Sequence, residues 1–216
     1  MGTHLHPPAH LGLNSMYVPA AFLHEPPRPR KTRYLAILAN ALEKHHDNGV
    51  RFDLGCWFER RYDVDHNWCG SEACAVGLAM SIPEFNRKGL GIAGNCVQPA
   101  LYKGPTISPF EKYKVIESGR TPIYPSERDA NVSIGFASVM WFFGLSGMEV
   151  AWLFVGSAYD QPDDPEDYEP SSGDKAARAV AKRIRALLAG EPATPNTSIA
   201  KWATTNLCEA PLPMWD

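Results

Sequence analysis

The feature that most constrains the fold is an apolar run over residues 131–159, which carries a single charged side chain, Glu149. A stretch this apolar has to be buried, either in protein or in a bilayer. Gly144 follows a helical pattern over residues 134–143 and would end it. Ser146 and Glu149 then have the spacing of a capping box that begins a second helix. Each half is too short to cross about 30 Å of hydrocarbon, so we predict a hairpin of two buried helices in a soluble protein and no membrane span.

Three other segments have the apolar spacing of amphipathic helices. Residues 32–46 are followed by an Asp-Asn-Gly stop, and residues 171–190 end at Gly190. Residues 197–207 form a shorter helix. The basic face of the second segment is interpreted as solvated. The expected apolar positions of the first two are Tyr34, Leu35, Leu38, Ala41 and Leu42, and then Ala177, Val180, Ala181, Ile184 and Leu188.

Residues 50–58 alternate apolar and polar side chains, which is the pattern of a half-buried strand. This alternation predicts that Cys56 points into the core. The small residues over 70–81 then predict a helix with Ser71 as its N-cap. Gly77 inside that helix costs about 1 kcal/mol relative to alanine, which indicates that another backbone segment passes close to it.

These elements predict a helix-rich α+β fold, with about five to six helices around a short strand or small sheet. The strand over residues 50–58 should pack on the helix over residues 70–81. The side chains expected to share one core are Leu38, Phe52, Leu54, Val76, Trp141, Leu153 and Ile184.

The chain is expected to form a single globular domain over residues 32–208, between a proline-rich arm (1–31) and a short tail (209–216). Inside the domain, residues 82–125 form a long, loop-rich, irregular insertion. Segments of this kind are often lids or partner surfaces, and the alternative is a long, well-packed surface loop. Residues 160–170 are dense in carboxylates and are predicted to be a solvated acidic loop rather than a calcium site.

Composition limits the function classes. The net charge of -3 gives no general reason to expect nucleic acid or an anionic membrane as the main partner. The five cysteines form an odd, unevenly spaced set, which is typical of a reducing cytoplasm rather than of a disulfide framework. The first residues do not resemble a secretory signal, so a cytoplasmic location is expected.

Residues 65–77 gather several reactive side chains, and one interpretation is a thiol hydrolase or transferase. Cys69 would lie at the start of the helix, where the macrodipole lowers a thiol pKa and backbone amides can bind an oxyanion. His66 or His46 would be the base. All histidines precede Cys69, whereas papain-like and transglutaminase-like enzymes place the histidine after the cysteine.

A second interpretation is a zinc site built from His66, Cys69 and Cys74, with Cys96 or Cys56 as a fourth ligand. These residue types suit zinc. On a helix, however, Cys69 and Cys74 would be about 140 degrees apart, which makes shared coordination awkward. No cofactor is therefore expected, with zinc as the open alternative.

In the third interpretation the two thiols pack as small hydrophobic groups and the protein is non-catalytic. The central stretch then serves packing and binding, and its candidate binding residues are Trp57, Gly70, Ser71, Glu72 and Cys74. This favours a protein-interaction or assembly module with a protein partner.

Three motifs stand out as a set: Phe52-Asp53-Leu54-Gly55-Cys56-Trp57, then Cys69-Gly70-Ser71-Glu72-Ala73-Cys74-Ala75-Val76-Gly77, then Phe143-Gly144-Leu145-Ser146 with Ala151-Trp152-Leu153-Phe154. Together they resemble an uncharacterised family of bacterial and phage proteins with Phe-Asp/Asn-Met-x-x-Trp, Cys-Gly-Thr-x-x-Cys-x-x-Gly and Leu-Phe-Gly-Leu-like segments. Here Leu54 replaces the usual Met and Ser71 the usual Thr. The resemblance covers residues 32–190. It implies this fold outline and a bacterial or phage origin, and it implies no activity.

Overall fold

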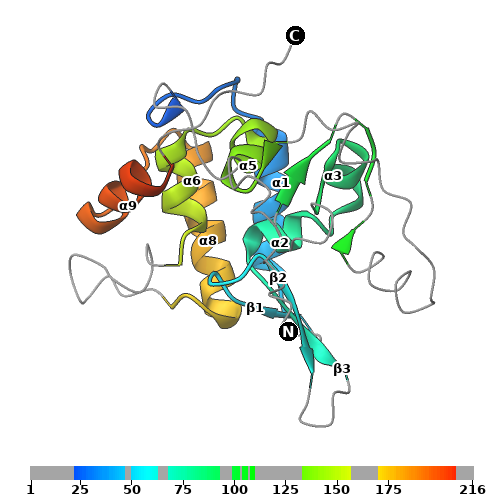
Figure 1. The fold of residues 1–216 in the computed structure, drawn as a ribbon. Helices are drawn as coiled ribbons and strands as arrows, with labels where there is room; N and C mark the ends of the chain where they lie inside the picture. Colours follow the sequence, from blue (N-terminus) through cyan, green and yellow to red (C-terminus); the bar gives the residue numbers. More distant parts are fainter. Residues whose placement is uncertain are drawn as a thin grey trace, which may run out of the picture.

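A computed structural model describes residues 22–46, 50–62, 68–92, 99–102, 104–106, 108–109, 133–156 and 170–207. Within these ranges the chain forms seven helices and two small three-stranded sheets (Figure 1). The predicted helix-rich α+β class is confirmed. The predictions for residues 1–21, for the acidic loop over 160–169 and for the tail fall outside the described ranges.

Helices α1 (Thr32–Glu43) and α8 (Gly173–Leu188) pack along each other through the middle of the molecule (Figure 1). Each turns its predicted apolar stripe inward, and Arg185 on α8 forms an ion pair with Glu43 at 2.9 Å. Helix α1 ends three residues earlier than predicted. The buried residues at this junction include Leu35, Leu38, Leu42, Ala177, Val180 and Ile184.

Helices α5 (Phe136–Phe143) and α6 (Gly147–Phe154) come from the apolar run. Gly144 ends α5 at φ 67°, and Ser146 and Glu149 form the predicted capping box. The two helices are therefore confirmed. The chain bends by 108° between them, so they do not fold back on each other as the predicted hairpin would. Across the described ranges no single helix is long and apolar enough to cross a bilayer; α5 and α6 pass that test only as a bent pair.

The first sheet has the order β1-β3-β2. Its strands are β1 (Val50–Phe52), β2 (Phe58–Tyr62) and β3 (Trp68–Ala73), with β3 parallel to β1 and antiparallel to β2. The single strand predicted over residues 50–58 is therefore interrupted, because residues 53–57 turn between two strands.

The helix predicted over residues 70–81 is wrong in its first half. Ser71 is not an N-cap but a buried residue of β3, paired with Val50 on one side and Arg60 on the other. The helix that follows, α2 (Ala75–Ala79), is short and begins after Cys74. Two flanking strands satisfy the backbone of β3 from both sides, and that pairing outweighs the helical spacing of its small residues.

The described part of the predicted insertion is more regular than expected. It contains α3 (Pro83–Arg87), β4 (Leu90–Ile92) and β5 (Pro99–Leu101), and β5 also pairs with β6 (Ser133–Ile134). All residues of β4 and β5 are buried. These short strands are thus part of the packed body.

All seven residues of the predicted core pack in one cluster, with Trp141 partly buried against it. Helix α9 (Thr197–Leu207), predicted from the sequence, adds Ile199 and Ala203 to this core. Residues 22–31, which the sequence assigned to the arm, also join the body. Leu23 is buried, and its carbonyl accepts a hydrogen bond from the Met148 amide of α6 at 2.9 Å.

Candidate binding pocket beside Trp57

The candidate site is built on the turn between β1 and β2. Asp53 orders this turn, because its Oδ1 accepts a hydrogen bond from the Gly55 amide at 2.7 Å, as in an Asx turn. The Cys56 thiol lies 3.8 Å from the Asp53 carbonyl oxygen and donates to it. The Leu54 amide donates to the Ser171 carbonyl at 2.9 Å, which ties the turn to the start of α8.

One side of this turn is closed against α2. The Cys74 amide donates to the Cys56 carbonyl at 3.0 Å, and the Cys74 thiol lies 3.7 Å from the Trp57 carbonyl. A Cβ on Gly77 would overlap the same Trp57 carbonyl oxygen. The close backbone approach predicted at Gly77 is confirmed, and its cause is the main chain of the turn.

Cys74 serves as the N-cap of α2, where serine, threonine, aspartate and asparagine are usual. Its Sγ accepts a hydrogen bond from the Gly77 amide at 3.4 Å. Burial raises the pKa of the Cys74 thiol from 9.0 to about 11. The thiol is therefore protonated at neutral pH, and its role is structural.

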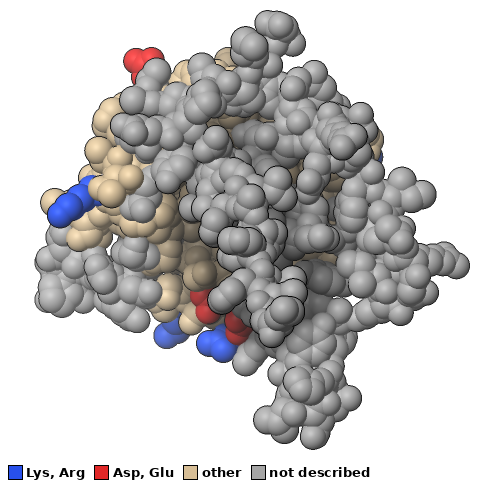
Figure 2. All heavy atoms as spheres, viewed as in Figure 1, with Lys and Arg blue, Asp and Glu red and all other residues tan. Residues whose placement is uncertain are grey.

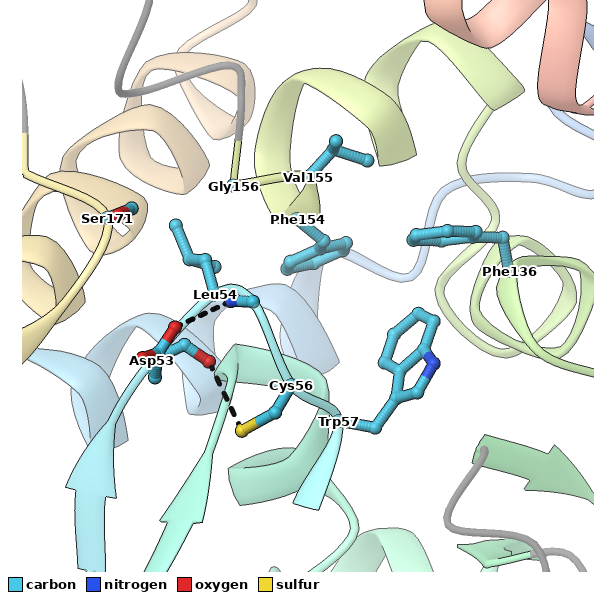
Figure 3. A pocket seen from close by; sticks show the side chains of 10 residues that line it. Asp53, Leu54, Cys56, Trp57, Phe136, Phe154, Val155, Gly156 and Ser171 are labelled. Carbon is cyan, nitrogen blue, oxygen red and sulfur yellow. Dashed lines mark hydrogen bonds between the residues drawn. The ribbon is translucent and has the colours of Figure 1, made fainter. Parts of the chain in front are cut away.

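The opposite side of the turn opens into a pocket of about 430 Å³ (Figure 3). Leu54, Gly55, Cys56 and Trp57 form one wall, and residues from α5, from the end of α6 and from the segment before α8 form the rest. These other lining residues are Phe136, Phe154, Val155, Gly156 and Ser171, with Asp53 at the edge of the turn.

Aromatic rings form one end of the pocket. Trp57 and Phe136 meet edge to face with centroids 4.6 Å apart, and Phe136 in turn meets Trp202 of α9 at 5.7 Å. In Figure 3 the indole of Trp57 reaches toward Phe136, while Asp53 and Cys56 lie on the other side, with their hydrogen bonds inside the turn. The pocket therefore presents mainly aromatic and aliphatic surface.

The residues predicted as a site are only partly brought together. Trp57 lines the pocket, whereas Cys74 lies on the closed side of the turn. Gly70, Ser71 and Glu72 belong to β3. Glu72 forms an ion pair with Arg51 of the neighbouring strand at 3.5 Å, so its described role is within the sheet.

The thiol-nucleophile hypothesis placed Cys69 at a helix N-terminus, and this placement is wrong because Cys69 belongs to β3. His46 is exposed, and its Nδ1 lies 3.7 Å from a carboxylate oxygen of Asp174 on α8. The other proposed base, His66, falls outside the described ranges. The helix-dipole argument for lowering the Cys69 pKa no longer applies.

The argument against a zinc site assumed that Cys69 and Cys74 share one helix. In the structure a strand carries the first and a helix cap the second. His66 and Cys96 lie beyond the part of the chain that the structure describes. Within that part, no three His, Cys, Asp or Glu residues come together in a metal-binding arrangement.

Most of the pocket was not anticipated from the sequence. Phe136, Phe154 and Ser171 are far from Trp57 along the chain, and nothing local marks them as neighbours. Cys56 was expected in the core but is only partly buried and lines the pocket. The one local signal was the Asp53-Leu54-Gly55 sequence, which favours a turn within the alternating pattern.

The chain was compared with protein-family models, with curated proteins and with solved structures, and none of them matches it. The geometry of the pocket is therefore the basis for inferring a function.

Proposed function

We propose that this chain is a non-catalytic protein-interaction module, and that an apolar side chain of a protein partner binds in the pocket beside Trp57. The observation that carries this proposal is the pocket lining. The aromatic rings of Trp57 and Phe136 face the opening, whereas the carboxylate of Asp53 and the thiol of Cys56 make hydrogen bonds inside their own turn.

The lining favours a partner side chain over a small polar substrate. Pockets for small molecules range over about 300–1,000 Å³ and usually contain a few polar groups that converge on the ligand. The pocket volume of about 430 Å³ fits this range. Asp53 and Cys56, however, make their hydrogen bonds within the turn, and tryptophan is enriched among residues that dominate protein interfaces.

The two thiols on either side of the turn support a location in a reducing compartment. Both Cys56 and Cys74 are free thiols, and each donates to a main-chain carbonyl. We place the protein in the cytoplasm of a bacterium or of a phage-infected cell, in keeping with the resemblance.

The experiment uses amino-acid amides as stand-ins for partner side chains. N-acetyl-phenylalaninamide and N-acetyl-leucinamide are titrated into labelled protein, and the amide signals of Gly55 and Gly156 are followed by NMR. Both signals should shift, with a dissociation constant of about 1–10 mM. Trp57→Ala should weaken binding about tenfold, because it removes the largest aromatic wall. Trp141→Ala, a partly buried tryptophan outside the pocket, is the control.

Two results would contradict the proposal. One is the absence of any shift at Gly55 and Gly156; the other is equal weakening by Trp57→Ala and Trp141→Ala. Cys69→Ser addresses the thiol-enzyme hypothesis and should leave binding unchanged. If Cys69→Ser keeps its melting temperature but loses a measurable activity, the thiol nucleophile replaces the binding module.

A further inference from the structure

The pocket beside Trp57 has a second end, which carries a negative charge. Asp53 and Ser171 both belong to the lining of the pocket. In Figure 3 they lie on the side of Leu54, across the view from the ring of Phe136. The pocket therefore has an aromatic end and an end with a carboxylate.

The carboxylate of Asp53 has open acceptor sites. Its Oδ1 accepts one hydrogen bond, from the Gly55 amide at 2.7 Å, whereas an ionised carboxylate has about four acceptor positions. Within the described residues, no Lys, Arg or His side chain forms an ion pair with Asp53. A cation that a ligand brings to this end of the pocket would therefore meet a carboxylate that accepts charge-assisted hydrogen bonds.

The cations on the neighbouring elements do not neutralise Asp53. Arg51 of β1 pairs with Glu72 of β3 at 3.5 Å. Lys175 of α8 is exposed and makes no ion pair within the part of the chain that the structure describes. The charge of Asp53 is thus left for a partner.

The surrounding sequence adds negative charge to this end. Asp174 lies in the first turn of α8, three residues after Ser171, with Nδ1 of the exposed His46 at 3.7 Å from its carboxylate. The stretch of sequence that joins Gly156 to Ser171 contains six carboxylates and no Lys or Arg. Because both of these joined residues line the pocket, the local charge favours a cationic ligand over an anionic one.

We propose that the partner segment is basic, and that a lysine or arginine next to its apolar side chain pairs with Asp53. This inference rests on the proposed function, because it places the apolar side chain of a protein partner at the aromatic end. An exposed ion pair adds little affinity, but complementary charge selects one partner over another. Asp53 would then decide which apolar segments the module accepts.

A basic protein segment is favoured over a nucleic acid. Binding of a nucleic-acid strand calls for an extended basic track, and the chain has a net charge of -3. Figure 2 shows Asp and Glu atoms beside Lys and Arg atoms at the lower edge of the molecule, where Figure 1 places β1 and the start of α8. The residues coloured there are mixed in charge, which suits a single ion pair and not a row of phosphates.

The test uses N-acetyl dipeptide amides that join phenylalanine to lysine, glutamine or glutamate, in both orders. The amide signals of Gly55 and Gly156 are followed by NMR at an ionic strength of about 0.01 M. In at least one order the lysine peptide should bind about threefold more tightly than the glutamine peptide, and the glutamate peptide should bind most weakly. Salt at about 1 M should remove this preference and leave the binding of the glutamine peptide in place.

Asp53→Asn removes the charge, while the amide oxygen of asparagine still accepts the hydrogen bond from the Gly55 amide. This variant should lose the preference for lysine and bind the glutamine peptide as the unchanged protein does. The matched control is Glu191→Gln. It changes an exposed carboxylate beyond the other end of α8, about 24 Å from the start of that helix by its rise per residue, and should keep the preference.

The outcomes separate this inference from the proposed function. Equal binding of the three peptides, a preference that survives salt at about 1 M, or equal effects of Asp53→Asn and Glu191→Gln would overturn the basic partner and leave the apolar pocket in place. If no peptide shifts the signals of Gly55 and Gly156, both proposals fail. The salt series on the unchanged protein gives the same decision if Asp53→Asn does not fold.

Discussion

The two sides of the turn over residues 53–57 are organised in opposite ways. On one side, the carbonyls of Cys56 and Trp57 contact α2 so closely that Gly77 has no room for a Cβ. On the other side, the side chains of Cys56 and Trp57 line an open pocket. The main chain of the turn is fixed, and its side chains remain available to contact a ligand in the pocket.

This difference shows how a partly exposed tryptophan can be positioned for binding. A binding residue is best oriented when rigid elements hold its backbone. The backbone of Trp57 is fixed from behind by Cys74 and Gly77, so its indole can line the pocket while the main chain stays in place. Substitutions that change one side of the turn at a time test this difference.

Gly77→Ala should disrupt the contact between α2 and the turn over residues 53–57. The added Cβ would overlap the Trp57 carbonyl oxygen, which is main chain and cannot rotate away. We expect a loss of more than about 3 kcal/mol in the free energy of unfolding, because either α2 or the turn has to move. Urea denaturation followed by circular dichroism measures this loss. A loss below about 1 kcal/mol would show that the two elements are not held together.

Raising the pH should weaken the contact between α2 and the turn, because it deprotonates the Cys74 thiol. The pKa of its buried thiol is raised from 9.0 to about 11, so the folded state keeps a proton that the unfolded chain releases. The stabilisation is complete below pH 9.0 and is lost as the pH rises toward about 11. The expected loss is about 2–3 kcal/mol.

Urea denaturation across this pH range measures the effect, and Cys74→Ser is the reference because its hydroxyl does not titrate there. The quantity of interest is the difference between the two proteins, since lysines and tyrosines titrate in both. Parallel pH profiles would contradict a buried thiol at Cys74.

Cys74→Val at neutral pH should cost about 1–2 kcal/mol. Valine keeps the apolar packing but cannot accept the hydrogen bond from the Gly77 amide or donate to the Trp57 carbonyl. Cys74→Ser keeps both functions and should cost less. Thermal unfolding of the two variants measures this difference. A valine variant as stable as the serine variant would show that the cap contributes nothing.

Gly156→Ala should have the smallest effect on stability. An added Cβ there would lie 3.6 Å from the nearest atoms of Leu54, which is ordinary van der Waals contact. The free energy of unfolding should change by less than about 0.5 kcal/mol. Because Gly156 lines the pocket, the same variant should weaken binding of N-acetyl-phenylalaninamide. A stability loss comparable to that of Gly77→Ala would remove the contrast between the two sides.

Local signals in the sequence predicted local structure well. The break between α5 and α6 was predicted because Gly144 and the Ser146–Glu149 pair act within one helical turn. The tight approach at Gly77 was predicted because a glycine inside a helix has a cost that packing has to justify. The break between α5 and α6 depends on residues close in sequence. The approach at Gly77 depends on the backbone cost of a glycine in a helix.

Non-local pairing was harder to predict. Ser71 and its neighbours have low strand propensity, and they form β3 only because β1 and β2 flank them. The pocket depends even more on distant segments, since Phe136 and Ser171 meet Trp57 only after the helices have packed. An alternating pattern cannot show that Asp53 turns the chain and redirects Cys56.

Because α1 packs on α8, the native body can form only late in protein synthesis. About 130 residues separate the end of α1 at Glu43 from the start of α8 at Gly173. At about 5–20 residues per second, the ribosome takes on the order of ten seconds to make them. Throughout that delay the apolar stripe of α1 lacks the helix that covers it, and the native body closes only after α8 has left the exit tunnel.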